Sequence, residues 1–162
     1  MKRHFIREKE YRKLREKLPP PVQSTISRRN LDKTGAEEVY LKNLKIYLLK
    51  GEPLLIEDKN GTIFPSLRFS EALMAIPKVV VDMGAVPHVG MGADVMRPGV
   101  VGVEGEFAGG TLVTVIEEKG RKPIAVGLSL YSSKDLRELS SGKVVKLLHY
   151  LGDELRKIPS SV

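Results

Sequence analysis

The 162-residue sequence contains no cysteine, which excludes disulfide bonds, thiolate metal sites and thiol catalysis. It has no apolar run near the ~18 residues that a membrane helix needs. Its basic N-terminal stretch also lacks the apolar segment of a secretory signal. A chain with these absences is typical of the cytoplasm, so we expect a cytoplasmic protein that does not associate with membranes.

The usual signatures of catalysis are missing as well. The sequence has three histidines that lie far apart, without metal-ligand spacing: His4, His88 and His149. It has no Gly-x-Ser-x-Gly elbow and no Walker phosphate loop. Gly90 and Gly92 do not continue as a dinucleotide-binding Gly-x-Gly-x-x-Gly, because Val95 holds the third place. We therefore expect no enzymatic activity, no metal and no cofactor.

Positive charge is concentrated at one end of the chain. Residues 1–30 carry ten Lys or Arg and three Glu, whereas residues 31–162 carry seventeen of each sign, so the first segment holds the whole net charge of +7. This basic arm favours a polyanion, either nucleic acid or an anionic membrane face. A solvated helix of the kind found in heat-adapted proteins has the same composition, and the sequence leaves both interpretations open. The cations of the basic arm are Lys2, Arg3, Arg7, Lys9, Arg12, Lys13, Arg15, Lys17, Arg28 and Arg29.

The first half of the chain reads as helix followed by short strands. Apolar spacing predicts a helix over residues 2–18 that ends at three consecutive prolines, and residues 23–33 are either a loop or a second helix. Short strands are predicted at 39–41, 46–49 and 54–56, and Asn60-Gly61 is a strong hairpin signal. A short helix from Ser70 to Met74 precedes a boundary near residues 76–78.

The second half is dominated by strands. Ser132 and Asp135 resemble a capping box that starts a short helix, and a last strand is expected over residues 144–151. Short strands with turns every 8–12 residues indicate a compact β-barrel-like domain. The sequence thus predicts an α+β protein with a small N-terminal α/β domain at residues 1–77 and a β-pseudo-barrel with short helices at 78–162.

Residues 79–103 contain the most distinctive pattern, with four glycines between positions 84 and 99. Glycine admits positive φ and removes the side chain that would keep a partner away. A helical turn at residues 85–89 would offer N–H groups to a phosphate, and Arg97, expected on the adjoining strand, would add charge-assisted bonds to phosphate or a bidentate contact to a base. The same glycines would also serve barrel corners and tight turns, and spacing alone does not choose between these roles.

This stretch resembles the signature of the PUA domain, an RNA-binding module named for pseudouridine synthase and archaeosine transglycosylase. The matching residues are Val81-Asp82, Gly84-Ala85, Val89, Gly92-Ala93, Val95 and Pro98-Gly99, followed by Ala125–Gly127, Gly142-Lys143 and Leu148–Leu151. Together with Phe64–Arg68 upstream, the pattern is similar to the malignant-T-cell-amplified-sequence and ligatin-like family, in an archaeal-type form. That family joins a small pre-PUA domain to a PUA domain.

The resemblance implies a non-catalytic RNA-binding protein that acts in translation. Its expected ligand is tRNA, held at the acceptor stem and 3′ end, or rRNA, in initiation or ribosome recycling. The small ribosomal subunit and a translation-factor-like protein are expected partners. The positions that match the RNA-binding surface are Gly84, Ala85, Val86, His88, Gly90, Met91, Gly92, Ala93, Arg97, Pro98 and Gly99, flanked by Lys146, His149 and Tyr150. Two other functions stay open: an RNA-targeting subunit of a tRNA or rRNA modification enzyme, and a protein–protein adaptor.

Overall fold

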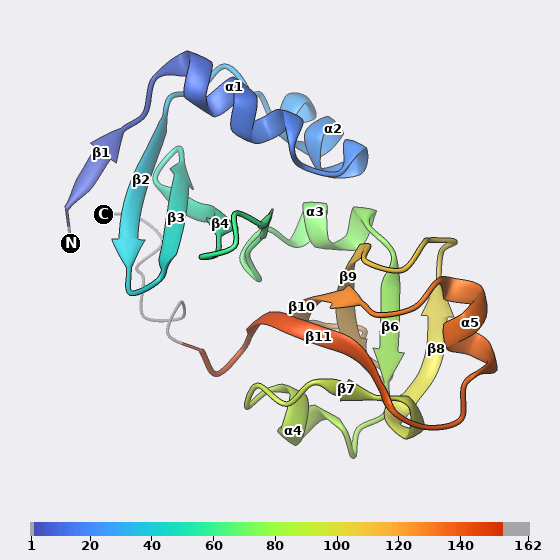
Figure 1. Cartoon of the computed structure of the whole chain (residues 1–162). Helices are drawn as coiled ribbons and strands as arrows, with labels where there is room; N and C mark the ends of the chain where they lie inside the picture. The colour runs from blue at the N-terminus through green and yellow to red at the C-terminus, as the bar shows by residue number, and fades with distance from the viewer. Residues whose placement is uncertain (1, 154–162) are drawn as a thin grey trace. The chain divides into compact units, whose positions relative to one another are not determined.

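The computed structural model describes residues 2–153. These residues form two compact units, 2–75 and 76–153. The first unit contains a five-stranded sheet and the second a six-stranded sheet, each accompanied by short helices (Figure 1). This architecture confirms the predicted α+β class.

The sheet of the first unit is a simple antiparallel meander in the order β1-β2-β3-β4-β5. Tight turns explain this order, because Lys50 and Gly51 adopt φ angles of 52° and 80° and so connect β3 to β4 in two residues. At the next turn Asp58 Oδ1 accepts hydrogen bonds from the backbone N–H groups of Asn60 and Thr62. The strands are β1 (Arg3–Phe5), β2 (Ala36–Leu41), β3 (Leu44–Leu49), β4 (Glu52–Glu57) and β5 (Ile63–Pro65).

The expected single helix over residues 2–18 is wrong at its start. Residues 3–5 form the edge strand β1, which pairs with Glu37–Val39 of β2, and α1 covers only Glu8–Glu16. The hydrogen-bonded pairing of residues 3–5 with β2, more than thirty residues away, outweighs the local helical pattern. The bidentate ion pair from Arg3 to Glu37, with N–O distances of 2.9 and 2.6 Å, supports this pairing.

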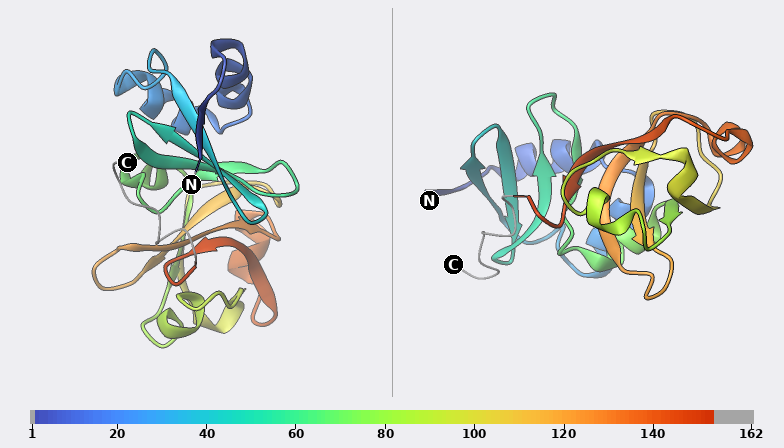
Figure 2. Two further views of the ribbon diagram at one scale, coloured as in Figure 1. Left: turned by 90° about the vertical axis from the view of Figure 1, so that its left-hand side faces the viewer. Right: turned by 90° about the horizontal axis from the view of Figure 1, so that it is seen from below.

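The proline run ends one helix and begins the next. Helix α2 covers Pro20–Arg28, because prolines in a first helical turn forgo only N–H groups that would lack intrahelical partners anyway. The segment 23–33 is therefore mostly helical rather than a loop. Helix α3 (Ser70–Ala75) lies where a short helix was predicted. In the figures α1 and α2 lie on one side of the sheet, and Tyr11, Leu14 and Ile26 are buried (Figure 1; Figure 2).

The second unit is a curled sheet in the order β7-β11-β10-β9-β6-β8 (Figure 2). Only β6 and β9 run parallel, and all other pairs are antiparallel. The predicted capping box starts its helix as expected, since Ser132 Oγ accepts a bond from the N–H of Asp135 at 3.1 Å. The elements are β6 (Lys78–Val81), α4 (Val86–Val89), β7 (Val95–Met96), the 3-10 helix η1 (Arg97–Gly99), β8 (Val100–Glu104), β9 (Leu112–Glu117), β10 (Pro123–Ser129), α5 (Ser133–Glu138) and β11 (Lys143–Tyr150).

The core of this unit is built from β-branched side chains. Val79, Val113, Val115 and Val144 are completely buried, and each valine contributes about 1.5–3 kcal/mol by leaving water. Val89 of α4 joins the same core, so the helix of the glycine-rich stretch is anchored from inside. Val95 and Val100 of the same stretch also belong to this core, whereas Met91 and Met96 are exposed.

Candidate nucleic-acid interface

The connection from β6 to β8 is closed by Asp82. Its backbone N–H donates to the carbonyl of Gly99 at 2.9 Å, which joins the two ends of the loop. Its Oδ1 accepts from the N–H of Ala85 at 2.9 Å and so fixes the residue that precedes α4. The signal for this role was present in the sequence, because an Asp immediately after a strand commonly forms such a turn.

A groove of about 520 Å³ lies between α4, β7 and η1. Gly99 allows its walls to approach, because a Cβ at this position would lie 3.1 Å from the Cβ of Ala85. The groove is lined by two carboxylates, from Asp82 and Asp94, and by backbone, apolar side chains and His88. No Lys or Arg is among its lining residues, all of which lie in the described part of the chain. The groove therefore suits groups that donate hydrogen bonds or stack, and disfavours a phosphate.

Asp94 holds the far wall of the groove against β11. Its Oδ1 accepts from the N–H of Leu147 at 2.8 Å, and its Oδ2 lies 3.0 Å from Lys143 Nζ. Burial alone would raise the pKa of Asp94, but the N–H of Leu147 and the ammonium of Lys143 together lower it. Asp94 is therefore ionised at neutral pH, and its pairing with Lys143 reduces the positive potential that this lysine would offer to a ligand.

The loop of residues 90–92 is held by the turn that follows β11. Gly152 donates its N–H to the carbonyl of Gly90 at 3.0 Å, and Gly92 adopts a φ of +104° against the ring of Tyr150. Met91, at the tip, is 79% exposed. The loop thus presents a flexible apolar side chain from a fixed backbone, which is a suitable surface for a base to rest against.

The structure brings only part of the expected surface together. Six of the expected residues line the groove: Gly84, Ala85, His88, Ala93, Pro98 and Gly99. Val86 packs on the core instead, and Lys146 is exposed on β11. His149 is only 4% exposed and interacts through Nδ1 with the carboxylate of Asp153. The burial of His149 thus disagrees with the expectation that its side chain contacts a ligand.

The position of Arg97 also differs from the expectation. It lies in η1 rather than on a strand, and its guanidinium donates to the carbonyls of Leu136 at 2.9 Å, Val100 at 3.1 Å and Arg137 at 3.3 Å. A guanidinium with three backbone acceptors ties η1 to α5 and β8 and is poorly placed to bind a phosphate. The start of α4 is also a weak anion site, because the Asp82 carboxylate already accepts the N–H of Ala85 and Pro87 supplies no donor.

The basic arm is folded into the first unit rather than extended, and several of its arginines serve the fold. Arg3 pairs with Glu37, and Arg28 and Arg29 both lie near the carboxylate of Glu71. Arg15 stacks 4.6 Å from the centre of the Tyr11 ring. Ion pairs also form at the start of α1 and within it, from Arg7 to Glu10 and from Arg12 to Glu8. Four lysines of the basic arm are exposed and form no ion pair among the described residues: Lys2, Lys9, Lys13 and Lys17.

Within residues 2–153 no three His, Asp or Glu side chains are grouped so that they could hold a metal ion. The same residues include no helix with the length and apolar character of a membrane span. Both findings concern the described residues alone.

Comparison with known proteins places this geometry in a family. Residues 77–151 match the PUA domain. The chain is 33% identical over 158 residues to the uncharacterized protein MJ1432 of Methanocaldococcus jannaschii, covering 95% of this chain and 94% of that protein. It is 36% identical over 119 residues to translation machinery-associated protein 20 of Schizosaccharomyces pombe, covering 70% of this chain and 66% of that protein. A crystal structure of a PUA domain from Aeropyrum pernix, in complex with tartrate, superposes with a TM-score of 0.81 at 30% identity, covering 95% of this chain and 88% of that one.

The curled sheet and the groove beside α4 therefore belong to a PUA-domain protein. The chain is a member of the family that comprises the malignant T-cell-amplified-sequence and translation machinery-associated 20 proteins together with their archaeal PUA relatives. The PUA domain and these relatives support a role in RNA binding connected with translation.

Proposed function

We propose that the protein is a non-catalytic factor that binds tRNA at its acceptor stem and 3′ end during translation initiation or ribosome recycling. The main support is the chemistry of the groove beside α4. Its lining has apolar surface, His88 and the carboxylates of Asp82 and Asp94, each of which also accepts a backbone N–H, and it contains no Lys or Arg. Unpaired bases carry amino groups and flat faces that fit such a lining, whereas duplex phosphates do not.

The exposed lysines of the basic arm supply the attraction that the groove lacks. Lys9, Lys13 and Lys17 are four residues apart, so they fall on one face of α1 and its C-terminal end. Such a stripe contacts phosphates irrespective of sequence and makes affinity dependent on salt. The groove then provides selectivity for an unpaired end, and the stripe provides most of the electrostatic binding energy. The small ribosomal subunit and a translation-factor-like protein complete the proposed set of partners.

The test compares intact tRNA with tRNA that lacks its unpaired 3′ nucleotides, by fluorescence anisotropy. Ala93 is exposed and lines the groove, so Ala93→Glu fills it with bulk and negative charge. We expect Ala93→Glu to weaken binding of intact tRNA about tenfold and to leave the affinity for the trimmed tRNA unchanged. Ala108→Glu is the matched control, because Ala108 is also exposed but lies in the loop before β9. Equal affinity of wild type and Ala93→Glu for intact tRNA would refute the assignment of the groove.

An adaptor function has one observation in its favour. Strand β1 is at the edge of its sheet, and its Phe5 side chain is 76% exposed. An edge strand with an exposed aromatic residue can pair with an extended segment of a partner protein. The adaptor function would be favoured if the wild-type protein binds no RNA at low salt and if a protein that co-purifies with wild type no longer co-purifies with Phe5→Ser. Co-purification with a modification enzyme instead of small ribosomal subunits would favour an RNA-targeting subunit.

A further inference from the structure

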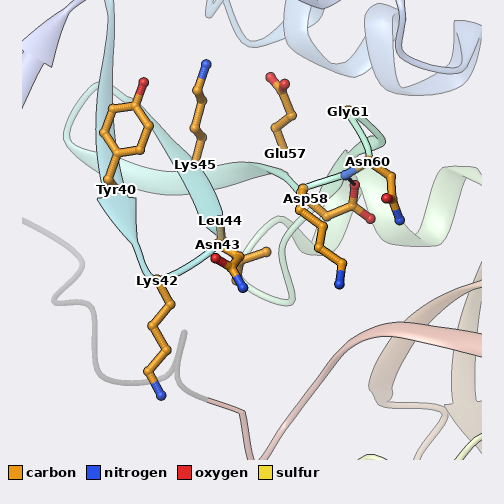
Figure 3. A pocket seen from close by; sticks show the side chains of 10 residues that line it. Tyr40, Lys42, Asn43, Leu44, Lys45, Glu57, Asp58, Asn60 and Gly61 are labelled. Carbon is orange, nitrogen blue, oxygen red and sulfur yellow. Dashed lines mark hydrogen bonds between the residues drawn. The ribbon is translucent and has the colours of Figure 1, made fainter.

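A second pocket, of about 540 Å³, lies in the first unit between the ends of two hairpins (Figure 3). One is the β2–β3 turn at residues 42–43, and the other is the β4–β5 turn at residues 58–62. This pocket is formed entirely by residues 40–61. It is therefore independent of the PUA groove, and the family resemblance did not suggest it.

A row of three side chains in register defines one side of the pocket. Tyr40 pairs with Lys45 across β2 and β3, and Lys45 pairs with Glu57 across β3 and β4. Figure 3 shows all three projecting to the same side of the sheet. Tyr40 is 55% exposed, and Lys45 Nζ lies 5.6 Å from the centre of its ring. The row thus combines an accessible aromatic ring with a cation.

Lys45 keeps its charge in this setting. Partial burial would lower its pKa, but Tyr40 and Glu57 together raise it above the ordinary value of 10.5. An ammonium that stays protonated near an exposed ring can meet a phosphate while the ring meets a base.

The acidic residues of the pocket are already engaged in the fold. Glu57 Oε1 accepts from the Tyr47 hydroxyl at 2.7 Å. Asp58 Oδ1 accepts the N–H groups of the β4–β5 turn at 2.9 and 3.0 Å. Their negative charge is partly neutralised by these donors, so the groups beside them that can meet a ligand are Tyr40, Lys45, Lys59 and Asn60. The side chain of Asn43 projects to the opposite side of the sheet from Tyr40 and Lys45 (Figure 3).

We propose that this pocket binds one nucleotide of a single-stranded RNA, with the base against Tyr40 and the phosphate near Lys45 and Lys59. The amide of Asn60, which also lines the pocket, has the donors and acceptor that match a base edge. An acidic peptide would use the lysines but would leave the Tyr40 ring and the Asn60 amide without a role. The proposal rests on the proposed function for the nature of its ligand, but it assigns a separate contact in the first unit.

The experiment measures binding of fluorescent single-stranded RNA hexamers to the full chain over a salt series. We expect Tyr40→Ala to weaken binding about tenfold, within the range seen when a stacking aromatic is removed, and Tyr40→Phe to bind like wild type. The double variant Lys45→Gln, Lys59→Gln should reduce the slope of log affinity against log salt by about 0.7 for each phosphate that the lysines no longer neutralise. Tyr131→Ala and Lys33→Gln are matched controls, because both residues are exposed outside the pocket.

Photocrosslinking with 4-thiouridine hexamers separates this proposal from the proposed function. A crosslink to the peptide that contains Tyr40 supports the pocket. If hexamers crosslink only to the groove beside α4 and Tyr40→Ala binds like wild type, the pocket is refuted while the proposed function stands. If intact tRNA and hexamers both fail to bind at low salt, both proposals fail. A polyglutamate peptide at equal charge concentration gives a further outcome. If it displaces the hexamer, and if Tyr40→Ala binds the peptide as wild type does, the pocket binds an acidic protein and the RNA proposal is overturned.

Discussion

Gly92 and Tyr150 are in such close contact that a side chain at position 92 would have to displace the Tyr150 ring and would strain the backbone. A Cβ on Gly92 would lie 2.8 Å from Cζ and 3.1 Å from the hydroxyl of Tyr150. The φ of Gly92 is +104°, a region that L-residues with side chains rarely adopt. The glycine therefore lets the loop before β7 pack directly on the end of β11, and it places Met91 at the surface.

The first prediction follows from this contact. We expect Gly92→Ala to lower the free energy of unfolding by about 2–3 kcal/mol, because both the backbone strain and the clash with Tyr150 oppose the native loop. Urea denaturation measures the effect. Gly110→Ala is the control for strain alone, since its φ is +84° and nothing lies within 4 Å of the added Cβ. If both variants lose the same stability, the contact with Tyr150 contributes nothing.

Arg97 supports the second prediction. Its guanidinium donates to the carbonyls of Leu136, Val100 and Arg137, so Arg97→Met should cost about 2–3 kcal/mol of stability by leaving these acceptors without their charged donor. Arg97→Lys should recover little, because one ammonium cannot span three carbonyls. The slope of log tRNA affinity against log salt should not change in the folded variants. If the midpoint of unfolding is unchanged and the slope of log tRNA affinity against log salt is reduced, Arg97 instead contacts a phosphate.

Local signals predicted the elements that depend on a few neighbouring residues. The turn at Asn60-Gly61 and the Ser132 cap formed as expected, because turn and cap chemistry act within four residues. Strand β1 could not be predicted, since its pairing with Glu37 is remote in sequence and a helical pattern covered the same residues. Predictions of element type fail in this way when tertiary pairing outweighs local propensity.

The polar contacts around the candidate site were harder to predict than the fold, for a related reason. Gly84 and Gly99, expected at the RNA-binding surface, both line the groove because they lack side chains, and their contact with RNA stays a prediction. His149 and Arg97 were expected at the ligand surface because they match or flank the RNA-binding positions of the family, yet one is buried and the other donates to backbone carbonyls. Composition does not reveal which polar groups the fold has already paired. For the same reason the sequence did not reveal that Asp94 accepts a hydrogen bond from Leu147, which is 53 residues away.

Asp94 gives the third prediction, on pH. Because its pKa is lowered in the folded protein, its contribution is present above its ordinary value of 3.8 and is lost as the pH falls through the lowered value. We expect Asp94→Asn to cost about 1 kcal/mol at pH 7, since the amide oxygen still accepts from Leu147 but the charge is gone. Asp94→Ala should cost about 2 kcal/mol, because the acceptor is removed as well.

Chemical denaturation between pH 2 and pH 7 checks this order. The difference between wild type and Asp94→Asn should be constant near neutral pH and shrink below pH 4. Lys143→Gln is the control for the ion pair alone, because it keeps the bond to Leu147, and it should cost less than Asp94→Ala. A difference that persists unchanged at pH 2 would assign the effect to packing rather than to charge.

The fourth prediction concerns the lysine stripe on α1. Lys9, Lys13 and Lys17 share one exposed face and have no ion pair among the described residues, whereas Arg3 is bound to Glu37. Replacing the three lysines with glutamine should reduce the slope of log tRNA affinity against log salt by about one unit for each lysine that meets a phosphate. The helix itself should persist, because glutamine and lysine have similar helix propensity. The triple variant Lys33→Gln, Lys50→Gln, Lys119→Gln removes the same charge from exposed positions elsewhere, so it separates a local contact from a change in net charge. Equal slopes for the two triple variants would mean that α1 is only a solvated basic helix and that attraction to RNA depends on the total charge of the protein.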